Sequence, residues 1–482
     1  MGIREVLEYI LEPLFGVKEE RRCLGQLRAR PVRVSVDALR SHTYVVGGTG
    51  TGKSRLLRVL IEQDIAAGHG LCLIDPHGDL CDASVRYLAT LPASHPVLSR
   101  TVLIDPTAPD WAVGFNPLDI PQGEDVYPHV LELLTVFEKL WGDSWGARME
   151  DLMRNSFITL AEQGRTLLDV PRLLTDEDFR AELVLHIRSP EAKSYWENRF
   201  GPLPARTKAE WVESTLNKVS TFITDPWIRD MVGQPLSTID PRRWMDEGMI
   251  TLVNVAKGRL KRNSDLVGAL FVAKIQEAAL SRVDLPEIDR RPYRLVVDEF
   301  QNYATRSFEE ILSEARKYGL CLMMANQTLT QLERTLLASV LGNCQVQIYF
   351  RCNRYDAETL ARQAFRATGK QIKFQLESKS LFSSDPRSNP VFVPVGEEME
   401  GYINFLLDLS PRQALLNVRG EGTPVPFRTA DAPDRDATPD LDLLRNQLLA
   451  RAARPRHEVR TEIQQQASTE NDVEPQDYWT PT

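Results

Sequence analysis

The sequence predicts an α/β fold with a mainly parallel sheet, interrupted by an inserted all-α domain. Short apolar runs alternate with helical patterns over residues 43–104, and the alternation resumes at residue 249. Between these stretches, residues 124–231 show helical periodicity with few β-branched runs. Alternating strands and helices are typical of parallel sheets that carry helices on both faces.

The first alternating stretch begins with an expected edge strand, where Val32, Val34 and Val36 are separated by polar residues. Further along, short buried runs are followed by helical patterns, as expected for strand–helix units. The expected strands are Val32–Val36, Thr43–Val46, Gly70–Ile74 and Thr101–Ile104, and the expected helices are Lys53–Ala67 and Asp79–Leu91.

The helical stretch has apolar side chains at spacings of three to four residues, as at Val130, Leu134 and Phe137. This spacing places them on one face of a helix. Its tryptophans (Trp141, Trp145, Trp196, Trp211 and Trp227) are expected to lie in a core rather than to form ligand platforms.

The second alternating stretch ends in a predicted hairpin. Its expected elements are the strands Ile250–Val255, Arg294–Val297, Leu320–Ala325 and Val346–Phe350, the helices Asp265–Arg282 and Phe308–Tyr318, and the hairpin of Gln413–Val418 with Val425–Arg428. The predicted domains are an N-terminal helix and linker (1–30), two parts of one motor domain (31–120 and 246–431), the all-α insertion (121–245), and a C-terminal segment (432–482). In that last segment we expect one helix, Leu441–Ala453, and otherwise a disordered tail.

Composition narrows the functional classes. The chain has 482 residues and a formal net charge of −9, so any contact with nucleic acid requires a local basic patch. No apolar stretch is long enough to span a bilayer, and Ile3–Phe15 lacks the basic start of a signal peptide. We therefore expect a cytoplasmic protein, with peripheral attachment to the inner membrane left open. None of the six cysteines forms a C-x-x-C pair, which favours free thiols in a reducing compartment.

A complete phosphate-binding motif follows the strand Thr43–Val46 and opens the next helix. In such a loop, glycines let the backbone N–H groups surround phosphates, and the helix N-terminus adds partial positive charge. Lys53 is expected to reach the β- and γ-phosphates of ATP, and Ser54 to ligate Mg²⁺. The motif, typical of RecA-like P-loop NTPases, comprises Gly47, Gly48, Thr49, Gly50, Thr51, Gly52, Lys53 and Ser54.

An acidic pair ends the apolar run Leu295–Val297. Carboxylates beside a buried strand are costly unless they have a partner, and a Mg²⁺-bound nucleotide would supply one. Asp298 is expected to hold the Mg²⁺ shell through water, and Glu299 to polarise the attacking water. The alternative is an ordinary strand end in solvent.

Over residues 40–430, four segments in this order resemble the TraG/TraD-type coupling ATPases of conjugative type IV secretion systems, within the FtsK/HerA superfamily. In that family a RecA-like motor domain carries an all-α domain inserted before the second acidic motif. The segments are Gly47–Ser54, Asp75–Asp79, Asp298–Phe300, and Glu314–Leu320 followed by Ala325–Gln327.

The resemblance implies further roles. Gln327 matches a residue that senses the γ-phosphate, Arg316 an arginine presented to the neighbouring subunit's nucleotide, and Asp75 an acid beside the phosphate loop. From the residues alone, Gln327 is equally a turn residue, Arg316 a solvated helix residue, and Asp75 a helix cap. Unlike most coupling proteins, the sequence shows no membrane-spanning helices, nor the N-terminal β-barrel of HerA helicases, which puts docking on a membrane channel in doubt.

The densest basic cluster of the motor portion follows the strand Ile250–Val255. A loop there is suited to hold DNA phosphates in the central channel of a ring without reading bases. A solvated surface loop and a contact to the neighbour's nucleotide remain alternatives, and Lys18–Arg30 is a second, weaker candidate. The cluster contains Lys257, Arg259, Lys261 and Arg262.

These observations favour an ATPase that moves single- or double-stranded DNA through a hexameric ring, as in conjugative transfer. Relaxase or secretion-channel proteins are the expected partners besides DNA. The alternatives are a HerA-like cytosolic helicase or translocase, a slow nucleotide-dependent switch, and a protein-secretion ATPase. Beyond the nucleotide site, the sequence offers no metal-ligand cluster that would indicate a nuclease.

Overall fold

The computed structural model describes residues 20–28, 30–121, 123–305, 308–369, 372–376, 388–436 and 440–469. The chain divides into two compact units. The first unit comprises residues 1–67 and 321–433, and the second comprises residues 68–320 and 434–482. Within the described residues, no helix has the length and apolar character needed to cross a membrane.

The first unit contains the strand preceding the phosphate loop, β3 (Thr43–Val46). This strand pairs in parallel with β9 (Leu320–Asn326) on one side and β10 (Val346–Phe350) on the other. Beyond β10 the strands are antiparallel, in the order β13 (Gln413–Val418), β14 (Val425–Thr429), β1 (Arg21–Leu27) and β2 (Arg30–Ser35). The predicted hairpin of β13 with β14 is confirmed.

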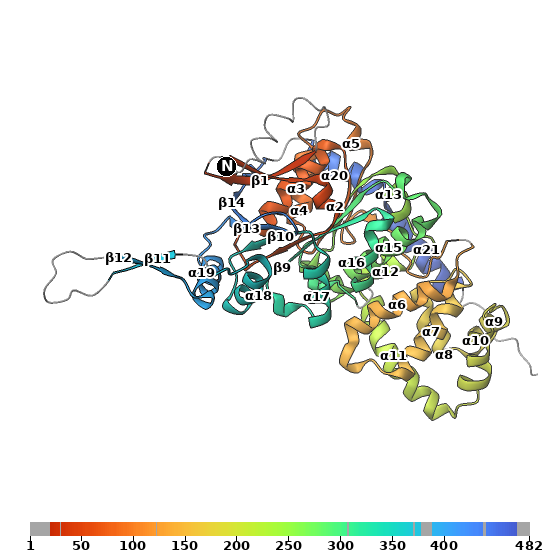
Figure 1. Ribbon diagram of the computed structural model, residues 1–482. Helices are drawn as coiled ribbons and strands as arrows, with labels where there is room; N and C mark the ends of the chain where they lie inside the picture. Colours follow the sequence, from red (N-terminus) through yellow and green to blue (C-terminus); the bar gives the residue numbers. More distant parts are fainter. Residues whose placement is uncertain are drawn as a thin grey trace, which may run out of the picture. The chain divides into compact units, whose positions relative to one another are not determined.

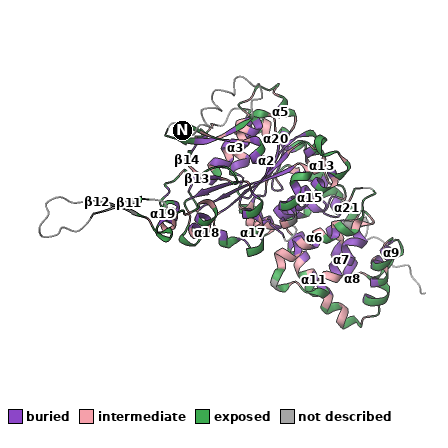
Figure 2. Ribbon diagram, viewed as in Figure 1, coloured by how far each residue is buried: buried purple, intermediate pink, exposed green. Residues whose placement is uncertain are grey.

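The helices of the first unit follow its strands along the chain. They are α2 (Val36–Arg40), α3 (Lys53–Ala67), α17 (Arg334–Asn343), α18 (Arg354–Ala364) and α19 (Val395–Leu407), and a separate hairpin joins β11 (Ile372–Leu376) to β12 (Ser388–Phe392). The alternation of strand and helix around β3 gives every residue of that strand a buried position, as Figure 2 shows for the central strands.

The second unit contains four parallel strands in the order β8 (Tyr293–Val297), β4 (Gly70–Asp75), β7 (Ile250–Asn254) and β5 (Thr101–Ile104). Parallel strands bring their carboxyl ends to one edge of the sheet, and ligands of open α/β sheets bind there. The chain therefore places the ends of β4, β7 and β8 at one edge. Helices between these strands include α4 (Asp79–Leu88), α5 (Pro96–Ser99), α14 (Lys257–Leu260) and α15 (Asn263–Ser281), and α16 (Phe308–Glu314) follows β8.

Between β5 and β7 the second unit is almost entirely helical, and the helices within residues 126–223 lie together in Figure 1. Aromatic side chains form their interior, with the rings of Phe137 and Phe157 5.5 Å apart. The elements are α6 (Val126–Trp141), α7 (Ala147–Ala161), α8 (Val170–Thr175), α9 (Glu177–Leu185), α10 (Pro190–Ser194), the π-helix Tyr195–Phe200, α11 (Ala205–Ile223), α12 (Pro226–Val232) and α13 (Pro241–Glu247), with the short strand β6 (Trp111–Ala112) before them. The predicted fold class, a mainly parallel sheet with an inserted all-α domain, is confirmed.

Two segments differ from the sequence-based expectation. Arg21–Leu27, expected in a helix and linker, forms β1 because it pairs on both sides, with β2 and with β14. The expected helix within residues 1–19 lies outside the described residues. At the C-terminus, α20 (Leu441–Ala450) is followed by a second helix, α21 (Arg456–Thr469), where a disordered tail was expected. Val459 and Ile463, one helical turn apart, bury their side chains beside Ala112, and this packing orders the segment.

Candidate nucleotide and nucleic-acid sites

The phosphate loop runs from the end of β3 into the first turn of α3. Gly50 and Gly52 have φ angles of 73° and 116°, which favour glycine. Gly47 and Gly52 are also closely approached: an added Cβ would lie 2.4 Å from Phe350 Cβ and 3.2 Å from Arg412 Cα, respectively. Conformation thus favours glycine at positions 50 and 52, and space favours it at positions 47 and 52.

Lys53 is buried at the start of α3, and its ammonium turns back onto the loop. Its Nζ donates hydrogen bonds to the carbonyl oxygens of Gly47 (2.5 Å) and Gly48 (3.2 Å). The Thr51 hydroxyl donates to the same Gly48 oxygen at 2.7 Å, while Ser54 is exposed. A lysine beside the loop, a helix N-terminus and an exposed hydroxyl together fit a magnesium-bound nucleotide phosphate chain.

Gln327 lies beside the phosphate loop, as the strand register requires. Val46 pairs with Asn326 across β3 and β9, so Gln327, the residue that follows β9, lies near the start of the loop. There the Thr49 hydroxyl donates to Gln327 Oε1 at 3.0 Å. The Tyr44 hydroxyl holds the neighbouring Asn326 in place by donating a hydrogen bond to its side-chain oxygen at 2.8 Å.

Two arginines that the sequence did not single out brace the loop through their backbones. Gly48 N–H donates to the carbonyl oxygen of Arg351 (2.9 Å), and Arg412 N–H donates to that of Thr51 (2.7 Å). Arg412 has a left-handed backbone (φ 70°), and its guanidinium donates to the Thr429 carbonyl oxygen and the Asp431 carboxylate. Because backbone contacts carry no residue-type pattern, no motif marks these positions.

The acidic pair lies at the carboxyl end of β8 in the second unit. Asp298 is buried, and its Oδ1 accepts a hydrogen bond from Glu299 N–H at 3.0 Å. Glu299 has a left-handed backbone (φ 49°, ψ 45°), which is strained for a residue with a side chain. Its Oε2 accepts from Gln301 Nε2 at 2.7 Å, so the carboxylate is oriented from its own turn.

Asp75 ends β4 at the same edge of the sheet, and its carboxylate caps α4. His77 N–H donates to Oδ1 at 3.0 Å, and Cys81 N–H donates to Oδ2 at 2.9 Å. Burial raises the pKa of Asp75, while these backbone donors act in the opposite direction. These hydrogen bonds agree with the capping alternative for Asp75, and its role beside the phosphate loop stays a prediction.

The remaining predicted residues lie on exposed turns of the second unit. Arg316 is exposed on the 3₁₀ turn Ala315–Tyr318, immediately before β9. The basic cluster forms the short helix α14 and the turn after it, following β7. Arg259 Nη1 donates to the Thr107 carbonyl oxygen at 2.9 Å, and Lys257 Nζ is 3.7 Å from an Asp265 carboxylate oxygen. Lys261 and Arg262 are exposed.

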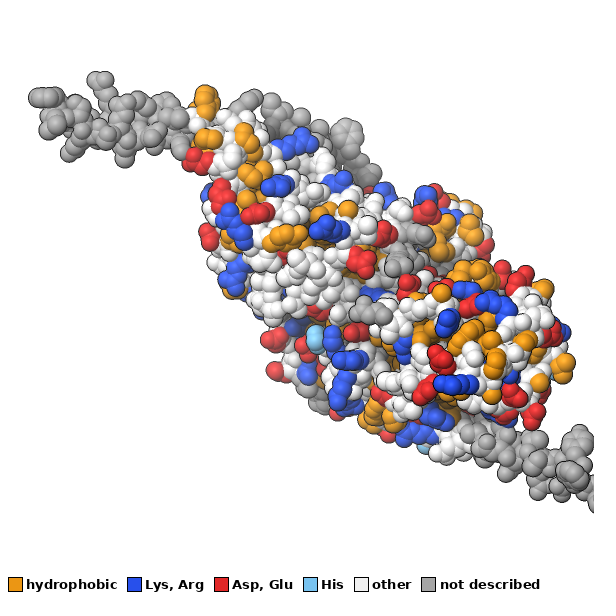
Figure 3. All heavy atoms as spheres, turned by 90° about the horizontal axis from the view of Figure 1, so that it is seen from below, with side chains coloured by type: hydrophobic (Ala, Val, Ile, Leu, Met, Phe, Trp, Pro, Cys, Tyr) orange, Lys and Arg blue, Asp and Glu red, His pale blue; other side chains and the backbone are white. Residues whose placement is uncertain are grey.

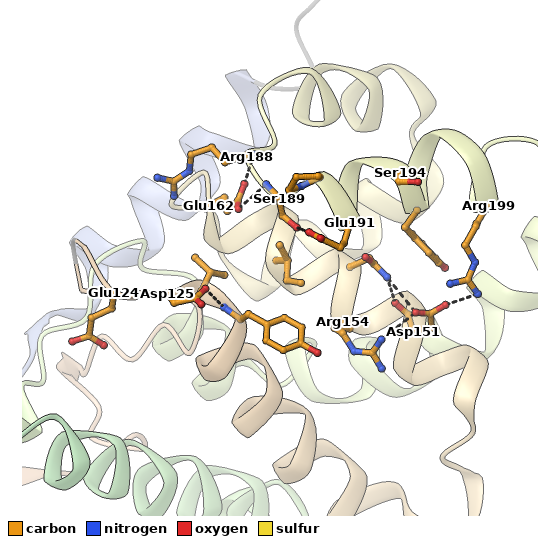
Figure 4. A pocket seen from close by; sticks show the side chains of 16 residues that line it. Glu124, Asp125, Asp151, Arg154, Glu162, Arg188, Ser189, Glu191, Ser194 and Arg199 are labelled. Carbon is orange, nitrogen blue, oxygen red and sulfur yellow. Dashed lines mark hydrogen bonds and ion pairs between the residues drawn. The ribbon is translucent and has the colours of Figure 1, made fainter. Parts of the chain in front are cut away.

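A large pocket of about 1100 Å³ lies among the helices α6, α7 and α10 (Figure 4). Its charged side chains mostly satisfy one another: Asp151 is held by Arg154 (3.2 Å) and Arg199 (2.8 Å). The Glu162 carboxylate accepts hydrogen bonds from the backbone N–H groups of residues 188 and 189. Two arginines of the pocket, Arg154 and Arg199, are thus already paired with a carboxylate. On the face seen in Figure 3, basic and acidic side chains are likewise interspersed.

Two family models match the sequence. "Helicase HerA, central domain" matches residues 22–158, which include the phosphate loop. "TraM recognition site of TraD and TraG" matches residues 292–385, which include the acidic pair, Arg316 and Gln327. No curated protein matches the chain in sequence.

Solved structures share the fold over nearly the whole chain. The bacterial conjugative coupling protein TrwBdeltaN70 is 17% identical, with a TM-score of 0.60, over 87% of this chain and 92% of that chain. TrwB in complex with a non-hydrolysable ATP analogue is 16% identical, with a TM-score of 0.59, over 89% and 94% of the two chains. VirB4 of Thermoanaerobacter pseudethanolicus is 15% identical, with a TM-score of 0.52, over 86% and 98%. The chain is thus similar to HerA over residues 22–158 and to TraD and TraG over residues 292–385, and it shares the fold of the conjugative coupling protein TrwB.

Proposed function

We propose that this protein is an ATP-driven motor that translocates DNA as a hexameric ring, as in conjugative transfer. The observation that carries the proposal is the contact between Thr49 of the phosphate loop and Gln327 at the end of β9. Such a contact lets a residue at a strand end respond to the γ-phosphate. The TrwB structures that share the fold include complexes with ATP and GTP analogues and with ADP and Mg²⁺.

In the proposed site, ATP with Mg²⁺ supplies the phosphoryl group that water attacks. Lys53 would neutralise the β- and γ-phosphates, and N–H groups of the loop 47–54 other than that of Gly48 would hold their oxygens. Ser54 would ligate Mg²⁺, and Asp298 would hold the Mg²⁺ shell through water. Glu299 accepts the proton of the attacking water, and Arg316 of one subunit stabilises charge in its neighbour's site.

DNA would be held by the basic cluster of residues 257–262 through its phosphates. The helical region of residues 121–245, between the proposed motor segments 31–120 and 246–431, would receive DNA or a partner such as a relaxase. The proposed setting is the cytoplasm, with secretion-channel proteins as further partners. A HerA-like helicase outside conjugation is the second candidate, favoured by the family match over residues 22–158.

Paired variants test the chemistry. Lys53→Ala should abolish nucleotide binding or turnover, because it removes the positive charge that binds the phosphates. Glu299→Gln should bind ATP but not hydrolyse it, because an amide cannot accept the proton of water. Binding is measured with a fluorescent ATP analogue and hydrolysis by phosphate release. Wild-type turnover by Glu299→Gln would disprove the assignment, and duplex unwinding would favour the helicase.

A further inference from the structure

The turn that follows β7 is tied to the turn that follows β4. Val255 N–H donates to the carbonyl oxygen of Asp75 (2.9 Å), and Lys257 N–H donates to that of Pro76 (2.9 Å). The backbone that begins the basic cluster is therefore attached to the turn that caps α4.

Asn254, the last residue of β7, joins three segments through its side-chain amide. Its Oδ1 accepts a hydrogen bond from Ala256 N–H (2.9 Å), and its Nδ2 donates to Asp105 Oδ2 (3.0 Å). The third segment is the turn before α4, at Gly78. A Cβ at Gly78 would lie 3.0 Å from Asn254 Oδ1, so this turn packs directly against the Asn254 amide. Asparagine suits this position because it accepts with one atom and donates with the other.

Asp105 extends the connection back to the basic cluster. Its Oδ1 accepts hydrogen bonds from both the N–H and the hydroxyl of Thr107, each at 2.8 Å. The Thr107 carbonyl oxygen in turn accepts from Arg259 Nη1 at 2.9 Å. The contacts run from Asn254 through Asp105 and Thr107 to Arg259, and form a closed circuit because Asn254 and Arg259 belong to the same turn.

The backbone of this turn is strained at two non-glycine residues. Ala256 has φ 52° and ψ 45°, and Lys261 has φ 53° and ψ −121°. Such conformations persist only where surrounding contacts impose them. The hydrogen bond from Ala256 N–H to Asn254 lies at the first of these positions. The turn therefore depends on Asn254 for its shape.

We propose that Asn254 and Asp105 form a positioning pair that presents Lys257–Arg262 to the phosphate backbone of DNA. The inference rests on the proposed function, because it specifies how the DNA-binding cluster is held. The pair itself does not touch DNA. It fixes the strained turn from which Arg259, Lys261 and Arg262 project, and it links that turn to the end of β4.

Exchanging the two side chains provides the test. In Asn254→Asp, the carboxylate still accepts from Ala256 N–H but faces the Asp105 carboxylate. In Asp105→Asn, the side-chain oxygen is retained for Thr107, and the new amide faces that of Asn254, donor against donor. The double variant Asn254→Asp/Asp105→Asn restores one donor and one acceptor in the reverse direction and leaves the net charge unchanged.

Two measurements on the full chain are compared: affinity for a fluorescent oligonucleotide, and the rate of tryptic cleavage after the basic residues of the cluster. Each single variant should bind DNA at least about fivefold more weakly and be cleaved faster in the cluster, because facing like groups break the circuit. ATP turnover without DNA should stay at the wild-type level. The double variant should regain both wild-type affinity and protection.

Single variants with wild-type DNA affinity, or a double variant as defective as the singles, would overturn the positioning role. A different result concerns the proposed function: if the wild-type protein binds no DNA at all, the motor proposal fails at that step. If the wild-type protein binds DNA and the Asn254 and Asp105 variants bind it equally well, only the positioning role of the pair is refuted. The two failures are therefore distinguishable.

Discussion

The hydroxyl of Thr49 donates a hydrogen bond of 3.0 Å to the side chain of Gln327, across 278 positions of sequence. The parallel register of β3 with β9 produces this contact, because the two residues follow paired strand ends. If Gln327 senses the γ-phosphate, loss of this contact should lower the rate of ATP hydrolysis rather than the stability of the fold.

Gln327→Ala should therefore retain ATP binding and lose about 10²-fold in kcat, as expected when one donor to developing charge is removed. Thr49→Val, which removes the hydroxyl, should lower kcat in the same direction, whereas Thr49→Ser should remain close to wild type. Steady-state kinetics separates kcat from KM. A Gln327→Ala variant that changes KM alone would assign the residue to binding.

Sequence patterns predicted the strands that are buried on both faces. A short apolar run such as Thr43–Val46 can be recognised as a strand from its own residues, without knowledge of its pairing partners. β1 was missed because its sequence, from Arg21 to Leu27, lacks a regular alternation of apolar and polar residues, and its strand conformation depends on pairing with residues around 429. The helix α21 was missed for a similar reason: its buried apolar residues, Val459 and Ile463, are few, and they pack against Ala112, which is distant in the sequence.

In the candidate site, too, local sequence motifs could be predicted, whereas contacts between distant segments could not. The phosphate loop is a local pattern and could be found from the sequence, as could the acidic pair. The backbone supports from Arg351 and Arg412, and the contact of Asn254 with Asp105, depend on strand order and turn geometry. No spacing in the sequence encodes them.

The C-terminal helix α21 should contribute strongly to stability through Arg456. Its buried guanidinium donates to the carbonyl oxygens of Pro106 (2.8 Å) and Trp111 (2.6 Å) and to the Asp230 carboxylate. Removing one partner of a buried ion pair costs about 3–5 kcal/mol, so Arg456→Ala should lower the free energy of unfolding by that amount.

Arg460 offers the matched control, because it pairs with the same Asp230 but is 47% exposed. Arg460→Ala should cost less than about 1 kcal/mol. Denaturant titration monitored by circular dichroism measures both variants. Equal effects of the two substitutions would show that burial of Arg456 is not the source of the stability.

His129 should make stability depend on pH. On α6, its Nε2 lies 2.7 Å from Glu124 and its Nδ1 lies 3.1 Å from Glu277 on α15, with Lys274 also paired to Glu277. The hydrogen bond with Glu277 raises the pKa of His129 above its usual value, although burial acts against it.

A raised histidine pKa stabilises the folded state fully below the unfolded value of about 6.5, and this contribution is lost as the pH rises through the folded pKa. The free energy of unfolding should therefore decline over that window in the wild type. His129→Gln should flatten the decline, whereas His186→Gln, at an exposed histidine, should not. An identical pH profile for wild type and His129→Gln would contradict the assignment.

Arg316 should act across subunits. Arg316→Ala subunits retain Lys53, and Lys53→Ala subunits retain Arg316, so neighbours in a mixed ring rebuild some complete sites. Each variant alone should be nearly inactive, since arginines supplied in trans contribute about 10³–10⁵ in rate. Mixing should restore measurable ATP turnover. Unchanged turnover by Arg316→Ala alone would exclude the trans role.

The central claim is that DNA and ATP hydrolysis are coupled, and steady-state ATPase activity with and without DNA tests it most directly. Purified wild-type protein is assayed over a range of protein concentrations, alone and with single- or double-stranded DNA, with Glu299→Gln as the blank. The account predicts turnover that rises steeply with protein concentration, because sites complete only on assembly, and that rises further with at least one form of DNA. Turnover per subunit that is independent of both concentration and DNA would contradict it.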